Sequence, residues 1–246
     1  MSTGLDVLEA LATTRAIRRY RYDEPVAEAD LARIMFAASR APSGSNRQLF
    51  RFLVLRDGPR AQQAKALLGE AFRSGWEVKK ATDGYDPGPG AAPASRKART
   101  ARALEEYVAN FERIPVVILA CLVRHRRPTP TEGASVYPAC QNLLVAARAL
   151  GYGGVMTMWH GGVEAQLREL LEIPEGVAVA ATITLGRPAG RHGPVRRKPL
   201  REFVYEDGWG QAASWALDPP GVQHAAGAAS DGTPRPAALS PEPDSR

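Results

Sequence analysis

An apolar run of eight residues, Val116–Val123, limits the folds open to this chain more than any other segment. It follows Pro115 and contains no charged side chain, so a strand made from it would be buried on both faces. Such a strand needs other layers above and below it, which predicts a central sheet with helices packed on it. The run is far shorter than the roughly 20 residues that a membrane-spanning helix needs, so we expect no membrane partner.

The remaining chain alternates irregularly between strand and helix patterns. Further strands are expected at 50–55 and 177–185, with a strand or extended loop at 153–159. The helices expected from apolar spacing lie at about 5–11, 31–38, 60–111 with one interruption, 135–150 and 163–171. Because strands and helices do not alternate regularly, we expect an α+β fold with a mixed or antiparallel sheet.

Composition excludes several classes of protein and site. Two cysteines cannot form a disulfide framework or a Cys-only zinc site, and Cys121 and Cys140 are expected to be buried thiols. The four histidines are scattered, so no metal site is expected. The N-terminal stretch includes Asp6 and Glu9 and does not have the pattern of a signal peptide, which predicts a cytoplasmic protein.

Familiar nucleotide and hydrolase motifs are absent from the sequence. No G-x-x-x-x-G-K-[ST], no G-x-G-x-x-G after a strand, no G-x-S-x-G and no H-E-x-x-H occurs. The net charge of +6 is compatible with nucleic-acid binding, but equally with an anionic small ligand. Aromatic residues are not interleaved with the basic runs, which disfavours the nucleic-acid alternative.

Three polar segments are candidates for a binding site. Arg15, Arg18 and Arg19 lie within five residues, and guanidinium groups are natural phosphate ligands, although a solvated basic surface fits as well. The turn-rich loop 41–48 offers hydroxyl and amide groups that could bind the polar edge of a heterocycle. The basic run 196–198 lies between two prolines and could complete a phosphate clamp.

Taken together and in this order, the segments resemble the FMN-dependent nitroreductase family. The resemblance rests on Arg15-Ala16-Ile17-Arg18-Arg19-Tyr20, on the loop 41–48, on the helix pattern at 135–150 and on Leu185–Pro188 followed by 196–200. It covers about residues 5–210. Thr14 and Ala16 stand where many members have Arg and Ser, and Met158 stands where an acidic residue is common.

The resemblance implies an α+β homodimer that binds FMN at two sites between its subunits. It implies cofactor contacts from the first basic segment, from the loop of the other subunit, from the end of a strand and from the second basic run. These residues are Arg15, Ala16, Arg18, Arg19, Pro42, Ser43, Gly44, Ser45, Asn46, Gln48, Met156, Thr157, Met158, Arg196 and Arg197. No side chain is expected to act as a catalytic acid or base.

The implied reaction is hydride transfer from NAD(P)H through flavin N5 to an electron-poor acceptor, a nitro compound or a quinone, in a ping-pong cycle. The alternative within the same fold is a dehalogenating, dehydrogenating or flavin-destroying enzyme. The expected flavin-binding domain covers residues 1–217, with an insertion at about 73–103 that covers the flavin face. Phe72, Trp76 and Tyr85 are candidates to line its pocket. Residues 218–246 are expected to form a disordered tail.

Overall fold

The computed structural model describes residues 5–85 and 95–224 of the chain. The chain divides into two units, Met1–Gly193 and Pro194–Arg246, and each is described by itself. The first unit contains all the strands and all the α-helices described below. We predicted that the flavin-binding domain ends at residue 217, and this boundary stays a prediction.

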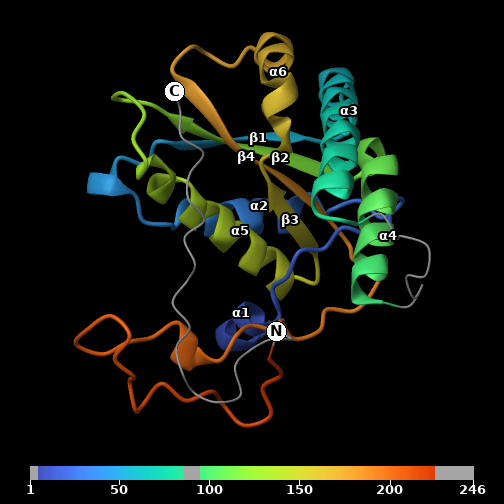
Figure 1. The fold of residues 1–246 in the computed structure, drawn as a ribbon. Coiled ribbons are helices and arrows are strands. Elements are labelled where there is room, and N and C mark those ends of the chain that lie inside the picture. Colours follow the sequence, from blue (N-terminus) through green and yellow to red (C-terminus); the bar gives the residue numbers. More distant parts are fainter. Residues whose placement is uncertain (1–4, 86–94, 225–246) are drawn as a thin grey trace. The chain divides into compact units, whose positions relative to one another are not determined.

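A four-stranded antiparallel sheet forms the centre of the first unit (Figure 1). Its strands are β1 (Phe50–Leu55), β2 (Val116–Val123), β3 (Gly153–Thr157) and β4 (Val177–Gly186), in the order β1-β2-β4-β3. β2 is buried along nearly its whole length, as its unbroken apolar run predicts. The prediction of helices around an antiparallel sheet is confirmed.

Two helical layers bury the two faces of β2. Val117, Leu119 and Cys121 belong to the core under α3 (Pro59–Thr82), α4 (Arg96–Ala109) and α6 (Glu164–Leu171). The alternate residues Val116, Ile118 and Ala120 belong to the core under α2 (Glu28–Ser39) and α5 (Tyr137–Ala149). The period of two along the strand therefore sends successive side chains into opposite layers. A short first helix, α1 (Val7–Thr13), contacts α5.

The open edge of β3 is covered by the segment that contains the first basic motif. Ala16 forms a parallel bridge with Gly154, and the Ile17 amide donates to the Gly154 carbonyl at 2.9 Å. Farther along, Tyr20 bridges to Pro188. Backbone pairing thus holds this segment against the strand, which satisfies groups that an edge strand would leave unpaired.

The expected insertion at about 73–103 is largely regular helix. α3 runs without a break to Thr82, and its Phe72 and Trp76 are buried in the core. Residues 86–94, the centre of the glycine- and proline-rich part, lie outside the described residues. Most of this segment therefore supports the sheet and covers one of its faces.

Both cysteines are buried and free, as predicted. Burial raises the pKa of the Cys121 thiol to about 11 and that of Cys140 to about 12, so neither is a reactive thiolate at neutral pH. None of the helices in the described ranges is long and apolar enough to cross a lipid bilayer.

The second unit has little regular structure among its described residues. A short 3-10 helix covers Leu200–Glu202, and the Leu200 amide donates to the Asp218 carboxylate at 3.2 Å. Arg197 and His224 form an isolated bridge. Residues 218–224, which we assigned to the tail, thus take part in defined contacts, whereas the rest of the predicted tail, 225–246, lies outside the described residues.

Candidate functional site

The first basic motif is extended and presents its arginines differently. Within the described residues, Arg15 and Arg18 form no ion pair, whereas Arg19 Nε lies 2.7 Å from the Glu106 carboxylate on α4. Arg15 is exposed and Arg18 is half-buried. Two of the three predicted phosphate ligands are therefore available to an anion, and the third is already paired.

Arg18 reaches a small aromatic cavity above β3, on the α3–α4 side of the sheet. Its volume is about 110 Å³, and residues from five different segments line it. The lining residues are Arg18, Phe72, Lys79, Tyr85, Thr100, Leu104, Tyr107, Val155, Thr157 and Trp159. We refer to it below as the aromatic cavity. Its flat side chains and two cations suit a planar group that carries negative charge at one end.

A buried chain of hydroxyl groups connects the cavity wall to the basic motif. The Tyr107 hydroxyl lies 3.1 Å from Thr184 Oγ1, which lies 2.8 Å from the Tyr20 hydroxyl. Tyr20 in turn donates to the Ile17 carbonyl at 2.6 Å. Burial raises the pKa of both tyrosines far above the neutral range, so both remain protonated. These hydrogen bonds hold in place the backbone segment that carries Arg18.

The end of β3 divides its side chains between the two faces of the sheet. Thr157 lines the aromatic cavity, whereas Met156 packs in the core on the α2–α5 side. Met158 follows the strand and is 48% exposed. Only Thr157 of the three predicted strand-end residues has its side chain at the cavity.

His160 stabilises the turn that follows this strand end. Its Nε2 lies 2.9 Å from the Val179 carbonyl, and its Nδ1 lies 3.2 Å from Thr182 Oγ1. Burial lowers the pKa of His160, so the neutral ring is the stable form at neutral pH. The contacts anchor the turn to β4 and thereby fix the position of Trp159 in the cavity wall.

The predicted cofactor loop is exposed and strained. Ser45, Asn46 and Gln48 all have a φ close to +50°, a region that costs a residue with a side chain about 1–2 kcal/mol. Within the loop, the Gln48 amide donates to Ser43 Oγ at 2.9 Å, and the Gly44 amide donates to Ser135 Oγ at 3.3 Å. Three strained positions in four residues are typical of a segment retained for binding.

This loop and the basic motif lie at opposite edges of the sheet. The loop 42–48 leads into the edge strand β1, whereas the segment that holds Arg15 and Arg18 pairs through Ala16 with the other edge strand, β3. Figure 1 labels both strands. Three interstrand spacings separate the two edges, about 14 Å. A single chain therefore does not bring the two predicted parts of the site together.

The second basic run belongs to the C-terminal unit. Arg196 donates through Nη2 to Gln223 Oε1 at 2.7 Å, and Arg197 donates through Nη1 to the Arg196 carbonyl at 3.2 Å. Both side chains are exposed. Their role at the phosphate end of the site remains a prediction.

Comparison with known proteins decides the family. The model of the nitroreductase family matches residues 11–187. The chain belongs to the nitroreductase family. A relative from Thermus thermophilus, named NADH dehydrogenase, is 31% identical over 212 residues, which cover 81% of this chain and 95% of the relative.

Solved structures agree with this assignment. A protein of Desulfovibrio desulfuricans, described as a nitroreductase in complex with FMN, is 30% identical, with a TM-score of 0.56 and coverage of 84% of this chain and 99% of the other. The NADPH:FMN oxidoreductase of Vibrio harveyi, at 21% identity, shares the fold with a TM-score of 0.59, covering 82% of this chain and 77% of the other.

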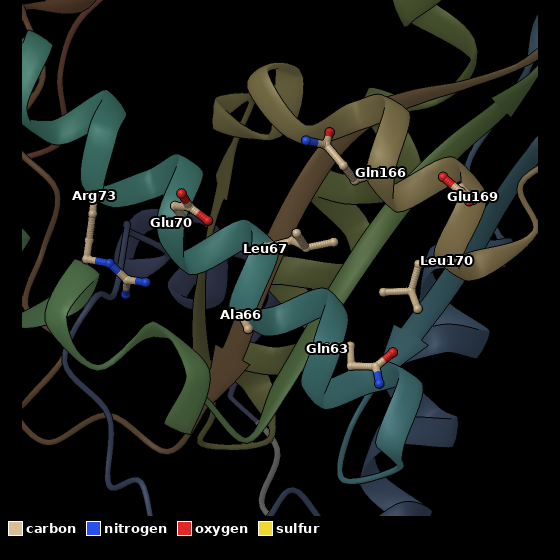
Figure 2. A pocket seen from close by; sticks show the side chains of 8 residues that line it. All are labelled: Gln63, Ala66, Leu67, Glu70, Arg73, Gln166, Glu169 and Leu170. Carbon is tan, nitrogen blue, oxygen red and sulfur yellow. The ribbon is translucent and has the colours of Figure 1, made fainter.

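A larger open cavity, of about 640 Å³, lies between α3 and α6 (Figure 2). Leu67 and Leu170 project into it, and Glu70 and Glu169 lie at its rim. Arg73, the only cation among the described residues that line it, is paired with Glu112 at 2.8 Å. None of the described residues that we predicted to bind FMN lines this larger cavity. Its carboxylates would also repel an anionic cofactor. The smaller, aromatic cavity is therefore the candidate site.

The structure adds residues to the site and removes one candidate. Phe72 and Tyr85 line the aromatic cavity as predicted, but Trp76 does not, because it is 1% exposed and packs behind Tyr85 at 5.4 Å between ring centroids. Lys79 and Trp159 were not predicted. Lys79 follows Phe72 by seven residues on one face of α3, a spacing visible in the sequence, whereas nothing local to Trp159 indicates its role.

Proposed function

We propose that this member of the nitroreductase family binds FMN, oxidises NAD(P)H and reduces an electron-poor acceptor, a nitro compound or a quinone. One observation carries the proposal: Arg15 and Arg18 have no acidic partner among the described residues, and backbone pairing holds their segment against β3, where Arg18 lines the aromatic cavity. A flavin mononucleotide combines a dianionic phosphate with a planar ring, and these residues offer a partner for each.

The residues present suit the cofactor's two ends. Arg15, exposed at the start of the motif, would bind the phosphate, and Arg18, in the cavity wall, would offset negative charge at the pyrimidine end of the ring. The aromatic walls would cover only part of the bound ring, because the cavity of one chain, at about 110 Å³, is smaller than the three-ring flavin. When bound, FMN would supply the hydride-transfer chemistry that links NAD(P)H to the acceptor.

The chain's own residues bind and orient, with no acid or base for the reaction among the described cavity residues. Burial keeps Tyr107 protonated. Lys79 is hydrogen-bonded to the Asp83 carboxylate, which raises the pKa of Lys79 and keeps it charged. Neither group can exchange a proton readily near pH 7, so we infer that the protein's contribution is positioning and electrostatics.

The active form is proposed to be a homodimer with composite sites. The strained loop Pro42–Gln48 of one copy would complete the cavity at β3 of the other, because one chain holds these parts at opposite sheet edges. Exposed apolar side chains on α1 and α2 offer a surface for contact with a second copy. Val7, Leu8 and Leu11 on α1 are 61%, 71% and 48% exposed, and Phe36 on α2 is 64% exposed. Exposed apolar side chains of this size favour burial against a partner.

The test begins with the purified protein. The proposal predicts stoichiometric bound FMN, bleaching of its absorbance by NADH or NADPH without oxygen, and recovery when a nitroarene or quinone is added. A matched pair separates binding from general charge effects: Arg18→Gln should lose flavin affinity, whereas Arg126→Gln, in an exposed loop beyond β2, should not. A protein that is colourless after incubation with excess FMN and removal of the unbound flavin, or whose flavin neither nicotinamide nucleotide reduces, contradicts the proposal.

A further inference from the structure

A cluster of basic side chains lies at the C-terminal end of α5, outside the aromatic cavity. Arg148, in the last turn of this helix, donates through Nε to Thr13 Oγ1 at 2.9 Å. Thr13 is the last residue of α1, which lies beside this end of α5 (Figure 1). Arg15, two residues farther on, and His192 lie in the same region, and the charges of Arg148 and Arg15 both act on the His192 ring. We call Arg15, Arg148 and His192 the basic cluster.

The packing in this region is close. A Cβ on Gly153 would lie 2.6 Å from Ile17 Cγ1 and 3.1 Å from His192 Nε2, so only glycine lets the ring and Ile17 approach the strand. Arg15 Nη1 lies 3.8 Å from where a Cβ on Gly193 would stand. The cluster is therefore assembled from α5 and from the segments that follow α1 and β4, and its His192 ring packs against β3.

The basic cluster has no acidic partner in the part of the chain that is described. Neither Arg15 nor Arg148 forms an ion pair there, whereas the nearby Arg187 is paired with Glu24 at 3.5 Å. Both ring nitrogens of His192 are shielded from water and lack a hydrogen bond, although the Thr13 and Tyr152 carbonyls lie near enough to affect the ring. Burial and the charge of Arg148 lower the pKa of His192.

One explanation for the position of Arg148 involves no ligand. A basic side chain in the last turn of a helix is favourable by itself, because it faces the negative end of the helix dipole. That explanation accounts for Arg148 alone. It does not account for the second guanidinium, that of Arg15, which also lacks an ion pair among the described residues, since like charges gathered without a counter-ion repel one another.

We propose that Arg148 and Arg15 together bind a phosphate monoester, with His192 forming the floor of the site. Two guanidinium groups match the two negative charges and several acceptor oxygens of such a phosphate. Arg148 would also shield the phosphate from the carbonyl end of α5, which would otherwise repel it. The inference rests on the proposed function, because the phosphate in question is that of FMN, and it adds Arg148 and His192 to the cofactor residues.

The experiment compares FMN with riboflavin, which has the same ring and no phosphate. Dissociation constants are measured for both flavins by quenching of flavin fluorescence, on wild type, Arg148→Gln, Arg148→Lys and the control Arg126→Gln. We expect Arg148→Gln to weaken FMN about 10-fold or more, as for a lost charge-assisted hydrogen bond, and to leave riboflavin within twofold. Arg148→Lys should recover part of the FMN affinity because it keeps the charge.

Melting temperatures of the flavin-free proteins identify a purely structural effect. Equal weakening of FMN and riboflavin by Arg148→Gln, or no change in either, overturns the phosphate assignment while leaving the proposed function intact. A wild-type protein that binds neither flavin overturns the proposed function and this inference with it. If Arg148→Gln does not fold, Arg148→Met, which also removes the charge, takes its place, and an unchanged ratio of FMN to riboflavin affinity in that variant overturns the inference.

Discussion

Gly154→Ala should destabilise the protein and weaken its flavin site at the same time. A Cβ at this position would overlap the Thr184 carbonyl oxygen of β4 and lie 3.0 Å from Leu144 Cδ2. Ordinary contacts begin at about 3.4 Å, and the obstacle is backbone within the β3–β4 ladder, so β3 must shift by roughly 1 Å. Overpacking of this kind costs up to about 3 kcal/mol.

The cost should appear as a lower melting temperature, by up to about 6–12 °C for a chain of this length. Gly161→Ala is the matched control, because a Cβ there meets nothing within 4 Å. The Gly154 carbonyl also accepts from the Ile17 amide, so the shift should displace the segment that carries Arg15 and Arg18 and weaken FMN binding. Thermal unfolding and flavin titration of both variants test this. A Gly154→Ala protein as stable as Gly161→Ala would refute the packing argument.

Three further perturbations have defined outcomes. Phe72→Ala should cost about 3–5 kcal/mol in urea unfolding, because the ring is fully buried against Phe111 at 4.4 Å and Trp159 at 5.3 Å, and a loss below about 1 kcal/mol would contradict this. Burial lowers the pKa of Lys65 below its usual 10.5, so between the two values the unfolded chain binds more protons than the folded one. The free energy of unfolding of the wild type should therefore rise with pH in that interval relative to Lys65→Met. Parallel stability curves for the two proteins from pH 7 to 10.5 would disprove this. Ser45→Gly relieves a positive φ, so the free energy of unfolding should be unchanged or higher by up to about 1 kcal/mol. The same change should lower the affinity for FMN. A flavin titration that matches the wild type would show that the Ser45 side chain does not contact the cofactor.

The sequence predicted the layers of the fold because apolar spacing is a local signal. The unbroken run of β2 and the helical spacing of α2 and α5 each follow from neighbours along the chain. The length of α3 was harder to predict, since the glycine- and proline-rich stretch begins only after Thr82 while Trp76 and Phe72 pack in the core before it. In the part of α3 before Thr82, composition alone does not distinguish an inserted segment from a helix that packs in the core.

The candidate site was predictable where one segment supplies it and not where several meet. The motif around Arg15 and Arg18 could be found from its arginines, but nothing in the sequence shows that Glu106 pairs with Arg19. Trp159 and Arg148 reach their places only through the pairing of β3 and the packing of α5 on α1. Contacts of this kind depend on tertiary structure, which a local pattern does not contain.

The central claim is that one flavin site combines the basic motif of one copy with the loop of another. Co-expression of two variants tests it directly: Arg18→Gln, which keeps the loop intact, and a chain with Ser45 and Asn46 both replaced by Ala, which keeps the arginine. Each variant alone should purify without FMN. Random pairing makes half of the dimers hybrid, each with one intact composite site, so the account predicts FMN in about a quarter of all sites. No recovery of flavin in hybrid dimers isolated by two affinity tags would contradict a shared site.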